Sequence, residues 1–555
     1  MRSSPLRSLC LSITLTLVLA VVAEAQFAKS HTFWGRQFSG AQSFGECVRG
    51  AGDLNADGFD DIVVGAPSDH KNGQYSGTVQ VFSGITGAEL FEANGNAPFD
   101  YFGDSVSGAG DVNNDGFADI VVGSPGYPFK VGRADIYSGF DGSTLYTFLG
   151  GSADFTFGSE VCSLGDINND GFDDVVIGAL QSGTVRVFSG FDGSVLHTFL
   201  GIHTNDNFGR SIDNAGDVDG DGTNDLVVGT PHANQFTGAV LIFSGATGAI
   251  LHTFHGNNTN DDFGTSVSTA GDLNDDGFAD VLVGAPGESN GFSSNGLAYA
   301  FSGFDGSMLF QLDGNLVGFS FGAAISGGSD LDGDGFEDMI VGAPDDNQHG
   351  GQSGSAVIFS GENGQIIHKF FGDSVKDFLG YSLDFVGDTN SDGFPDIVIG
   401  AYGDDLNSTN SIHSAVAGIG AARVYLGRLV PVSSYESNVG STTLSLGWTN
   451  TQGDPNALTG SFYSHSPSPF GRGFYGISQA PADVLTAFDF PALIALDPTN
   501  LISLRPLTYD AGGRFSVSNL SRQHPPLAGT YLYLQAFQTK PHFASSNGLK
   551  VLIAP

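Results

Sequence analysis

The chain has 555 residues, of which 60 are acidic and 20 are basic, so its formal net charge is −40. A charge of this sign argues against nucleic acid and anionic membranes as partners, and it calls for bound cations in a compact fold. The 82 glycines and 46 phenylalanines, against 3 methionines, favour an all-β chain.

Residues 1–25 have the pattern of a signal peptide. Arg2 and Arg7 precede the apolar run LCLSITLTLVLAVV, and the small residues AEA stand before Gln26. The alternative is a membrane anchor, but the run is shorter than the roughly 20 residues of a spanning helix. We therefore expect export and a secreted or cell-surface location (periplasmic or outer surface in a bacterium), with no transmembrane segment in the mature chain.

Residues 26–428 repeat one unit seven times. A nine-residue acidic loop follows a Phe-Gly pair (Leu-Gly in the last unit) and precedes a β-rich run that ends near GAP, such as IVVGAP at 62–67. An alternating run such as GTVQVFSG and a second one such as VLHTFLG complete the unit. These runs, separated by glycine turns, predict four short antiparallel strands in each unit.

Units of this kind bury both faces of their sheets only by stacking on their neighbours, which predicts a seven-bladed β-propeller. The last unit ends after its third strand, at residues 420–427. The segment SHTFWG at 30–35 reads like the fourth strands of the other units. We therefore expect the N-terminal strand to close the seventh blade and remove the exposed sheet edges.

The acidic loops have the composition of a calcium site. Numbered 1 to 9 from the first aspartate, they carry Asp or Asn at positions 1, 3, 5 and 9, and Gly at position 6. Calcium takes about six to eight oxygen ligands, which alternate side chains and a backbone carbonyl supply. Position 12 carries Val64 or an equivalent aliphatic residue instead of the glutamate of an EF-hand.

We predict up to seven structural Ca²⁺ ions, one in each loop. The predicted side-chain ligands are Asp53, Asn55, Asp57 and Asp61; Asp111, Asn113, Asp115 and Asp119; Asp166, Asn168, Asp170 and Asp174; Asp217, Asp219, Asp221 and Asp225; Asp272, Asn274, Asp276 and Asp280; Asp330, Asp332, Asp334 and Asp338; and Asp388, Asn390, Asp392 and Asp396. The predicted backbone-carbonyl ligands at position 7 are Phe59, Phe117, Phe172, Thr223, Phe278, Phe336 and Phe394.

Two other interpretations of these loops are solvated Asx turns and catalytic carboxylates. Seven near-identical sites around a rotational scaffold do not make one active site. Without a cation the crowded carboxylates repel one another, so we expect metal binding to be coupled to folding.

The recurring set of FG, acidic loop and GAP resembles the FG-GAP repeat, the unit of the N-terminal β-propeller of integrin α chains, over residues 27–428. The resemblance implies an extracellular propeller with calcium in the loops between strands 1 and 2 on one face. It also implies that the opposite face, made by the 2–3 and 4–1 loops, contacts ligands and partners. Here all seven units carry the full loop, whereas integrin α chains have it in only some.

By this resemblance, the 2–3 loops hold the ligand-face candidates Tyr75, Phe236, Phe292 and His413. The alternative for each of them is a solvent-exposed loop residue with no binding role. The expected partner is an extracellular protein or glycan.

The repeat is lost in residues 429–555, where runs such as YLYLQAF predict a small β-sandwich-like domain. Cys47 and Cys162 fall in non-neighbouring units, so we expect free thiols. The match of residues 318–322 to G-x-S-x-G around Ser320 overlaps a repeat and precedes a predicted strand, whereas a nucleophile elbow needs a helix.

These observations predict an exported calcium-binding propeller that serves as an adhesion or recognition module, with no catalytic residues. The alternatives are an extracellular hydrolase or lyase that uses the propeller as a scaffold, and a purely structural surface protein.

Overall fold

The structure is a computed structural model. It describes residues 15–16, 27–36, 42–127, 131–201, 206–288, 295–314, 318–405 and 419–427, and separate strands between 443 and 552. Phe292 and His413 lie outside the described residues, as does most of the predicted signal peptide.

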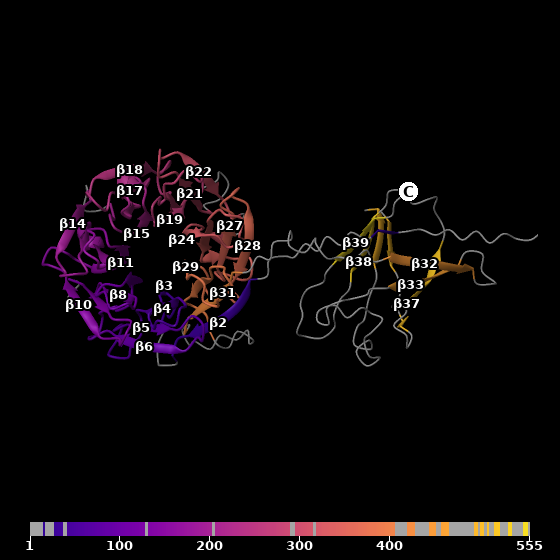
Figure 1. The fold of residues 1–555 in the computed structure, drawn as a ribbon, viewed down its shortest axis with the longest axis horizontal. Coiled ribbons are helices and arrows are strands. Elements are labelled where there is room, and N and C mark those ends of the chain that lie inside the picture. Colours follow the sequence, from indigo (N-terminus) through magenta and orange to yellow (C-terminus); the bar gives the residue numbers. More distant parts are fainter. Residues whose placement is uncertain are drawn as a thin grey trace, which may run out of the picture. The chain divides into compact units, whose positions relative to one another are not determined.

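Seven four-stranded antiparallel sheets form a closed ring, which confirms the predicted seven-bladed propeller (Figure 1). In order of blades 1 to 7, the strands are β3 (Cys47–Gly52), β4 (Asp61–Ala66), β5 (Thr78–Phe82) and β6 (Glu89–Asn94); β7 (Val106–Gly110), β8 (Asp119–Ser124), β9 (Arg133–Tyr137) and β10 (Thr144–Leu149); β11 (Phe157–Gly165), β12 (Asp174–Ala179), β13 (Thr184–Phe188) and β14 (Val195–Leu200); β15 (Ser211–Gly216), β16 (Asp225–Thr230), β17 (Ala239–Phe243) and β18 (Ile250–His255); β19 (Ser266–Gly271), β20 (Asp280–Ala285), β21 (Leu297–Phe301) and β22 (Met308–Leu312); β24 (Ala324–Ser329), β25 (Asp338–Ala343), β27 (Ser355–Phe359) and β28 (Ile366–Phe371); and β29 (Leu383–Phe385), β30 (Ile397–Ala401), β31 (Ala421–Leu426) and β2 (Ala28–Trp34).

The N-terminal strand closes the seventh blade, as predicted. β2 pairs antiparallel with β31, and Phe33 lies opposite Ala422. Phe33 also belongs to the hydrophobic cluster that joins blades 7 and 1, together with Val48 and Val398. Closure therefore buries apolar surface as well as pairing the free edge of β31.

The four strands of each blade lie side by side, in order from the centre of the ring to its rim (Figure 1). First strands contact the first strands of both neighbouring blades, and fourth strands such as β10 contain only exposed and half-buried residues or one buried residue. Second strands are buried throughout, because blades cover both of their faces. This burial explains the continuous aliphatic runs before GAP.

The FG and GAP motifs of the repeat lie at the contact between neighbouring blades. The Phe or Leu of each FG pair is at most 3% exposed. The glycine of GAP packs against the next blade: a Cβ on Gly65 would lie 2.2 Å from the carbonyl oxygen of Gly103, the glycine of the next FG pair. Glycine is required at this position because two backbones meet there.

Four short elements decorate the loops: η1 (Leu180–Ser182), α1 (Ala233–Phe236), β23 (Gly318–Phe319) and β26 (Asp345–Asp346). Asn234 and Gln235 within α1 have φ of 54° and 66°, so this segment is a turn rather than a helix. No helix among the described residues is long and apolar enough to cross a membrane. Cys47 and Cys162 are free, as expected.

The chain divides into two compact units, Glu24–Pro431 and a second made of Met1–Ala23 with Val432–Pro555. The described segments of the second unit are all strands: β1 (Leu15–Thr16), β32 (Thr443–Asn450), β33 (Ala457–Ser464), β34 (Leu493–Asp497), β35 (Asn500–Ser503), β36 (Thr508–Tyr509), β37 (Phe515–Ser521), β38 (Tyr531–Gln535) and β39 (Gly548–Leu552). They form one five-stranded sheet and two hairpins. The β-sandwich, the signal peptide and the boundaries at 26, 428 and 429 stay predictions.

Candidate metal centres

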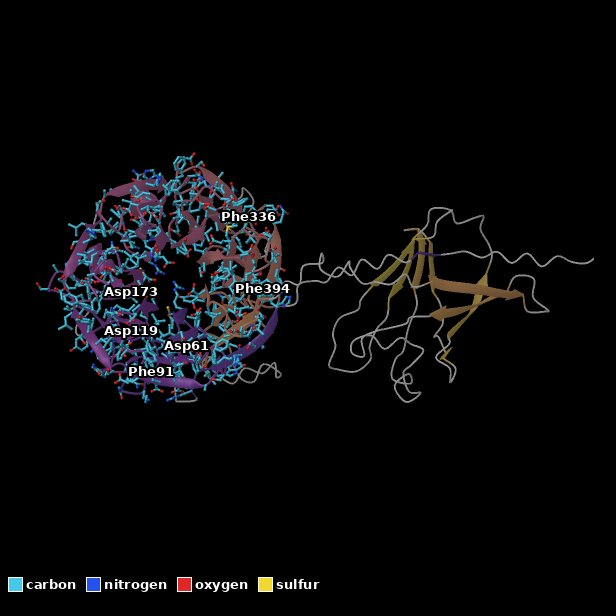
Figure 2. The ribbon with its side chains drawn as sticks, viewed as in Figure 1. Asp61, Phe91, Asp119, Asp173, Phe336 and Phe394 are labelled. Carbon is cyan, nitrogen blue, oxygen red and sulfur yellow. The ribbon has the colours of Figure 1, made fainter. Side chains whose placement is uncertain are left out.

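Each acidic loop connects the first and second strands of its blade. In blade 1 it runs from Asp53, just after β3, to Asp61, the first residue of β4. The same placement recurs in all seven blades, except that in blade 7 β29 ends at Phe385, before Asp388, and β30 begins one residue after Asp396. The loops therefore share one face of the propeller, which we call the metal-loop face. Figure 2 labels Asp61 and Asp119, the last loop residues of two neighbouring blades.

Backbone N–H groups orient the carboxylates at positions 1 and 5. In blade 1, Gly58 N donates to Asp53 Oδ2 at 2.8 Å, and Phe59 N donates to Asp57 Oδ1 at 3.1 Å. The equivalent two bonds recur in the other six loops at 2.8–2.9 Å and 2.9–3.1 Å. Each loop is therefore wound tightly around its first aspartate.

Two left-handed residues produce this winding. Position 6 is glycine with φ between 87° and 96° in every loop, as the sequence predicts. Position 4 is also left-handed, with φ from 55° to 75°, although it is glycine in only two loops. Sequence analysis missed position 4, whose restriction to Ala, Asn, Asp, Gly and Ser was the available signal.

The aspartate at position 9 is fully buried, and its carboxylate accepts hydrogen bonds from two backbone N–H groups, one in its own loop and one in the turn after the third strand. Asp61 Oδ2 accepts from Leu54 N at 3.0 Å, and Asp61 Oδ1 accepts from Gly84 N, in the turn between β5 and β6, at 3.1 Å. Burial raises the pKa of Asp61 to about 7, and the negative charges of Asp57 and Asp53 add to the rise. Burial likewise raises the pKa to about 7 in Asp119, Asp225, Asp280 and Asp338, and to about 6 in Asp174 and Asp396.

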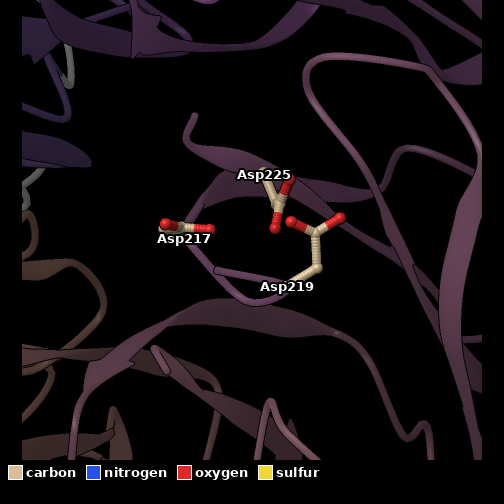
Figure 3. A group of neighbouring side chains, drawn as sticks. All are labelled: Asp217, Asp219 and Asp225. Atoms are coloured by element: carbon tan, nitrogen blue, oxygen red, sulfur yellow. The ribbon is translucent and has the colours of Figure 1, made fainter. Parts of the chain in front are cut away.

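Positions 1, 3 and 9 converge on one point. In blade 4, oxygens of Asp217, Asp219 and Asp225 lie within 4.8 Å of one another, and Figure 3 shows the three carboxylates facing each other. Asp330, Asp332 and Asp338 form the same group in blade 6. These two blades carry Asp at position 3, where the other five carry Asn.

The asparagine loops fit a cation as well. Asn113 Oδ1, at position 3 of blade 2, is buried and has no hydrogen-bond partner among the described residues. In blade 1, Asn55 Nδ2 lies 3.3 Å from Asp61 Oδ2, so rotation of the amide brings Asn55 Oδ1 to the same place. An oxygen without a donor, next to carboxylates of raised pKa, marks a place where a positive charge would be stabilising. A divalent cation supplies that charge.

The position-7 residues contribute more than the predicted carbonyl. In blades 2, 3 and 5 their rings pack on exposed phenylalanines of the 3–4 turns: Phe117 on Phe140, Phe172 on Phe191 and Phe278 on Phe304, with centroids 4.9–5.1 Å apart. Ligation by the position-7 carbonyls stays a prediction.

The opposite face, made by the 2–3 and 4–1 loops, is called the loop face here. Tyr75 is half-buried there, stacked on Tyr101 at 5.6 Å and packed edge-on against His70 at 5.0 Å. Phe236 is 48% exposed. Sequence analysis missed Tyr101 and Phe99, which is 49% exposed, because they belong to a 4–1 loop. The signal was their place just before the FG pair.

A group of ionisable side chains on the first strands was also missed. The charge of Arg49 (β3) acts on Asp384, Asp213 and Glu160, from three other blades. Burial raises the pKa of Glu160 to about 7 and that of Asp213 to about 6, although the nearby arginines oppose the rise. The available signal was that Arg49, Asp213 and Asp384 stand at equivalent first-strand positions, four residues after the glycine of the FG pair.

Ser320 does not form a nucleophile elbow. Its hydroxyl donates to Asp345 Oδ2 at 2.7 Å, and the next element is the strand β24 rather than a helix.

Comparison with known proteins agrees with this architecture. The profile described as FG-GAP repeat matches seven segments, residues 50–82, 102–143, 157–196, 208–243, 263–301, 321–359 and 379–422. Integrin alpha-5 from Xenopus laevis is 34% identical over 214 residues, covering 36% of this chain and 20% of that protein. Integrin alpha-V from Gallus gallus is 32% identical over 210 residues, covering 34% and 20%. Integrin alpha-2 from Bos taurus is 35% identical over 196 residues, covering 32% and 16%.

The chain thus spans only about a fifth of the length of these relatives. Each of the seven profile matches falls on one blade, from its FG pair or its first strand to its third strand or just beyond. The chain therefore belongs to the FG-GAP repeat proteins, and its propeller is similar to part of the integrin alpha chains.

Proposed function

We propose that this chain is an exported, calcium-binding FG-GAP propeller that recognises an extracellular protein or glycan at a cell surface or in the extracellular space. One observation carries the proposal: each of the seven equivalent loops has a fully buried aspartate at position 9, and in two loops the carboxylates of positions 1, 3 and 9 lie close together. A repeated site of this kind stabilises a scaffold, which leaves the varied loop face for recognition.

Calcium is the cation that best suits the donor set. The residues at positions 1, 3, 5 and 9 offer carboxylate and amide oxygens, which are the ligands of a hard cation, and the loops offer neither thiolate nor imidazole. A bound ion neutralises the buried position-9 carboxylate and joins the loop to the first residue of the second strand.

Equilibrium dialysis of metal-depleted protein against ⁴⁵Ca²⁺ tests this part of the proposal. We expect up to seven equivalents, with Mg²⁺ competing poorly because it demands a smaller octahedral site. Asp225→Asn and Phe236→Ala make a matched pair, since only the first replaces a predicted carboxylate ligand with a neutral amide. Absence of calcium binding contradicts the assignment of the loops.

Recognition is supported by the chemistry of the loop face and by the similarity to integrin alpha chains. Exposed Phe236 and Phe99 and the Tyr75 cluster present aromatic surface of the kind that anchors protein and glycan ligands. A pull-down from cell-surface and matrix fractions, with calcium and with chelator, tests it. We expect retention of a partner only with calcium. Retention of nothing under either condition contradicts the recognition role.

Export is supported by the pattern of residues 1–25. Fusing these residues to a reporter enzyme that is active only outside the cytoplasm tests it. The control is the same fusion with residues 13–19 replaced by a polar sequence. A reporter that stays inactive with the natural segment contradicts export.

A further inference from the structure

The acidic loops of neighbouring blades touch one another at position 8. The backbone N–H of Asp173, at position 8 of blade 3, donates to the carbonyl oxygen of Asp111, at position 1 of blade 2, at 3.3 Å. Ala118 makes the same bond to Asp53 at 3.2 Å, and Ala279 makes it to Asp217 at 2.9 Å. Position 1 of one candidate metal loop is therefore attached to the loop of the next blade.

In two blades the position-8 side chain accepts a hydrogen bond from the backbone of the neighbouring loop. Asp173 Oδ2 accepts from the backbone N–H of Asp111 at 2.8 Å, so Asp173 holds both backbone polar groups of that residue. Glu337 Oε2, in blade 6, accepts in the same way from the N–H of Asp272, at position 1 of blade 5.

Asp60, in blade 1, occupies the equivalent place beside blade 7. A Cβ on Gly387, the residue before Asp388, would lie 1.7 Å from Asp60 Oδ2. The corresponding separations are 2.0 Å for Gly110 and Asp173 and 1.4 Å for Gly271 and Glu337. In each case the glycine before position 1 leaves the space that the acid of the next blade fills.

The other four blades lack this acid. Position 8 is Ala118 in blade 2, Ala279 in blade 5 and Pro395 in blade 7, and Asn224 in blade 4 donates instead to the carbonyl oxygen of Leu164 at 2.9 Å. The acids therefore hydrogen-bond the loops in two pairs, blades 2 and 3 and blades 5 and 6, whereas Asp60 lies close to the loop of blade 7. The loop of blade 4 has no acidic link to either neighbour.

Position 8 precedes position 9, so two consecutive residues reach two metal loops. Asp173 holds the backbone of Asp111 in blade 2, whereas Asp174 is the buried carboxylate of the blade 3 loop. Fixing Asp111 on a bound ion fixes Asp173 as well, and this orients Asp174 before its own ion arrives. The carboxylate between the two loops also reduces the repulsion between two bound cations.

We propose, resting on the calcium-binding function above, that cation binding is coupled within the two hydrogen-bonded pairs of loops, blades 2 and 3 and blades 5 and 6: an ion in one loop raises the affinity of its partner. The blade 4 loop binds independently. A coupling at the lower end of the range seen between linked sites corresponds to about a fivefold change in affinity.

Removing one site from a linked loop and one from the unlinked loop tests the proposal. Asp115→Ala empties blade 2, and Asp221→Ala empties blade 4 by the same position-5 change. In ⁴⁵Ca²⁺ dialysis, both variants lose one equivalent at saturation. Near half-saturation Asp115→Ala loses more than Asp221→Ala, because the blade 3 site is weakened about fivefold.

Asp173→Ala is added both to the unmodified protein and to Asp115→Ala. In this background Asp115→Ala should lose only the calcium bound by one site, because the link to blade 3 is absent. Alanine stands naturally at this position in two blades of the same fold, so this variant is expected to fold. The reverse change, Ala279→Asp, has room in the hollow of about 360 Å³ that Ala279, Asp217 and Gly216 line. With Ala279→Asp present, Asp221→Ala should lose more bound calcium near half-saturation than the loss of one site explains. This variant tests the coupling even if Asp115→Ala misfolds.

Equal losses for Asp115→Ala and Asp221→Ala at every free calcium concentration overturn the coupling and leave calcium binding intact. Failure of the unmodified protein to bind calcium overturns both proposals, and the two results are therefore distinguishable.

Discussion

The two faces of the propeller differ in how they treat the repeat. On the metal-loop face, all seven blades use the same residues at positions 1, 5, 6 and 9 and the same backbone hydrogen bonds. On the loop face, blade 1 presents an aromatic cluster around Tyr75, whereas blade 4 presents a tight turn that exposes Phe236. The metal-loop face therefore repeats one structure in every blade, whereas the loop face gives the blades different surfaces.

Removal of calcium should have the largest effect on this comparison. A site saturated at 100 times its Kd stabilises the fold by about 2.7 kcal/mol, and the chain has seven candidate loops. We expect metal depletion to lower the Tm by at least about 10 °C in calorimetry. The control is a loop-face variant such as Phe236→Ala, which should lose as much. A Tm that does not respond to calcium contradicts the role of the metal-loop face.

Most of the metal-loop face follows from the sequence alone, because its chemistry is local. Nine consecutive residues specify their own turn, and seven repetitions separate the pattern from chance. The closing strand β2 was predictable for the same reason, since it resembles the other fourth strands. The hydrogen bonds of Asp173 and Glu337 to the neighbouring blades were not predictable, because they depend on the angle and distance between two blades. The cluster around Tyr75 joins two different loops, which no local pattern relates.

Within one loop, position 9 should matter more than position 5. Asp225 is fully buried and accepts from Val218 N and Gly245 N, so Asp225→Ala leaves two buried donors unsatisfied. We expect a loss of about 2–4 kcal/mol in urea unfolding of metal-depleted protein. Asp221→Ala removes an exposed carboxylate from the same loop and should cost under about 1 kcal/mol. Equal costs contradict the anchoring role of position 9.

The pH dependence of the metal-depleted protein should follow the position-9 aspartates. Their folded pKa is raised to about 6 or 7, above the unfolded value of about 4. Between these values the folded state holds more protons, so stability should fall as the pH rises from about 4 to about 7. Calcium-loaded protein should show a smaller fall, because the ion replaces the protons of the loop aspartates. Thermal unfolding at several pH values, with and without calcium, measures the difference.

Carboxyl groups on the first strands titrate in the same range and need a control. The pKa of Glu160 is raised to about 7, and this residue lies on a first strand away from the loops. Glu160→Gln should lower the slope in both metal states alike. A calcium-independent slope in the unmodified protein therefore assigns the effect to the first strands and contradicts the loop interpretation.

The smallest effect on stability should come from the loop face, and it is there that binding should change most. Phe236 is 48% exposed and contacts His232 at a centroid distance of 5.0 Å, so Phe236→Ala should alter the free energy of unfolding by less than about 0.5 kcal/mol. Partner retention in the calcium pull-down should nevertheless fall. Phe140→Ala, which removes a 65% exposed ring from the metal-loop face, is the matched control and should leave retention unchanged. If the two variants exchange these outcomes, recognition belongs to the metal-loop face, and the identity of its seven blades needs a functional explanation as well as a structural one.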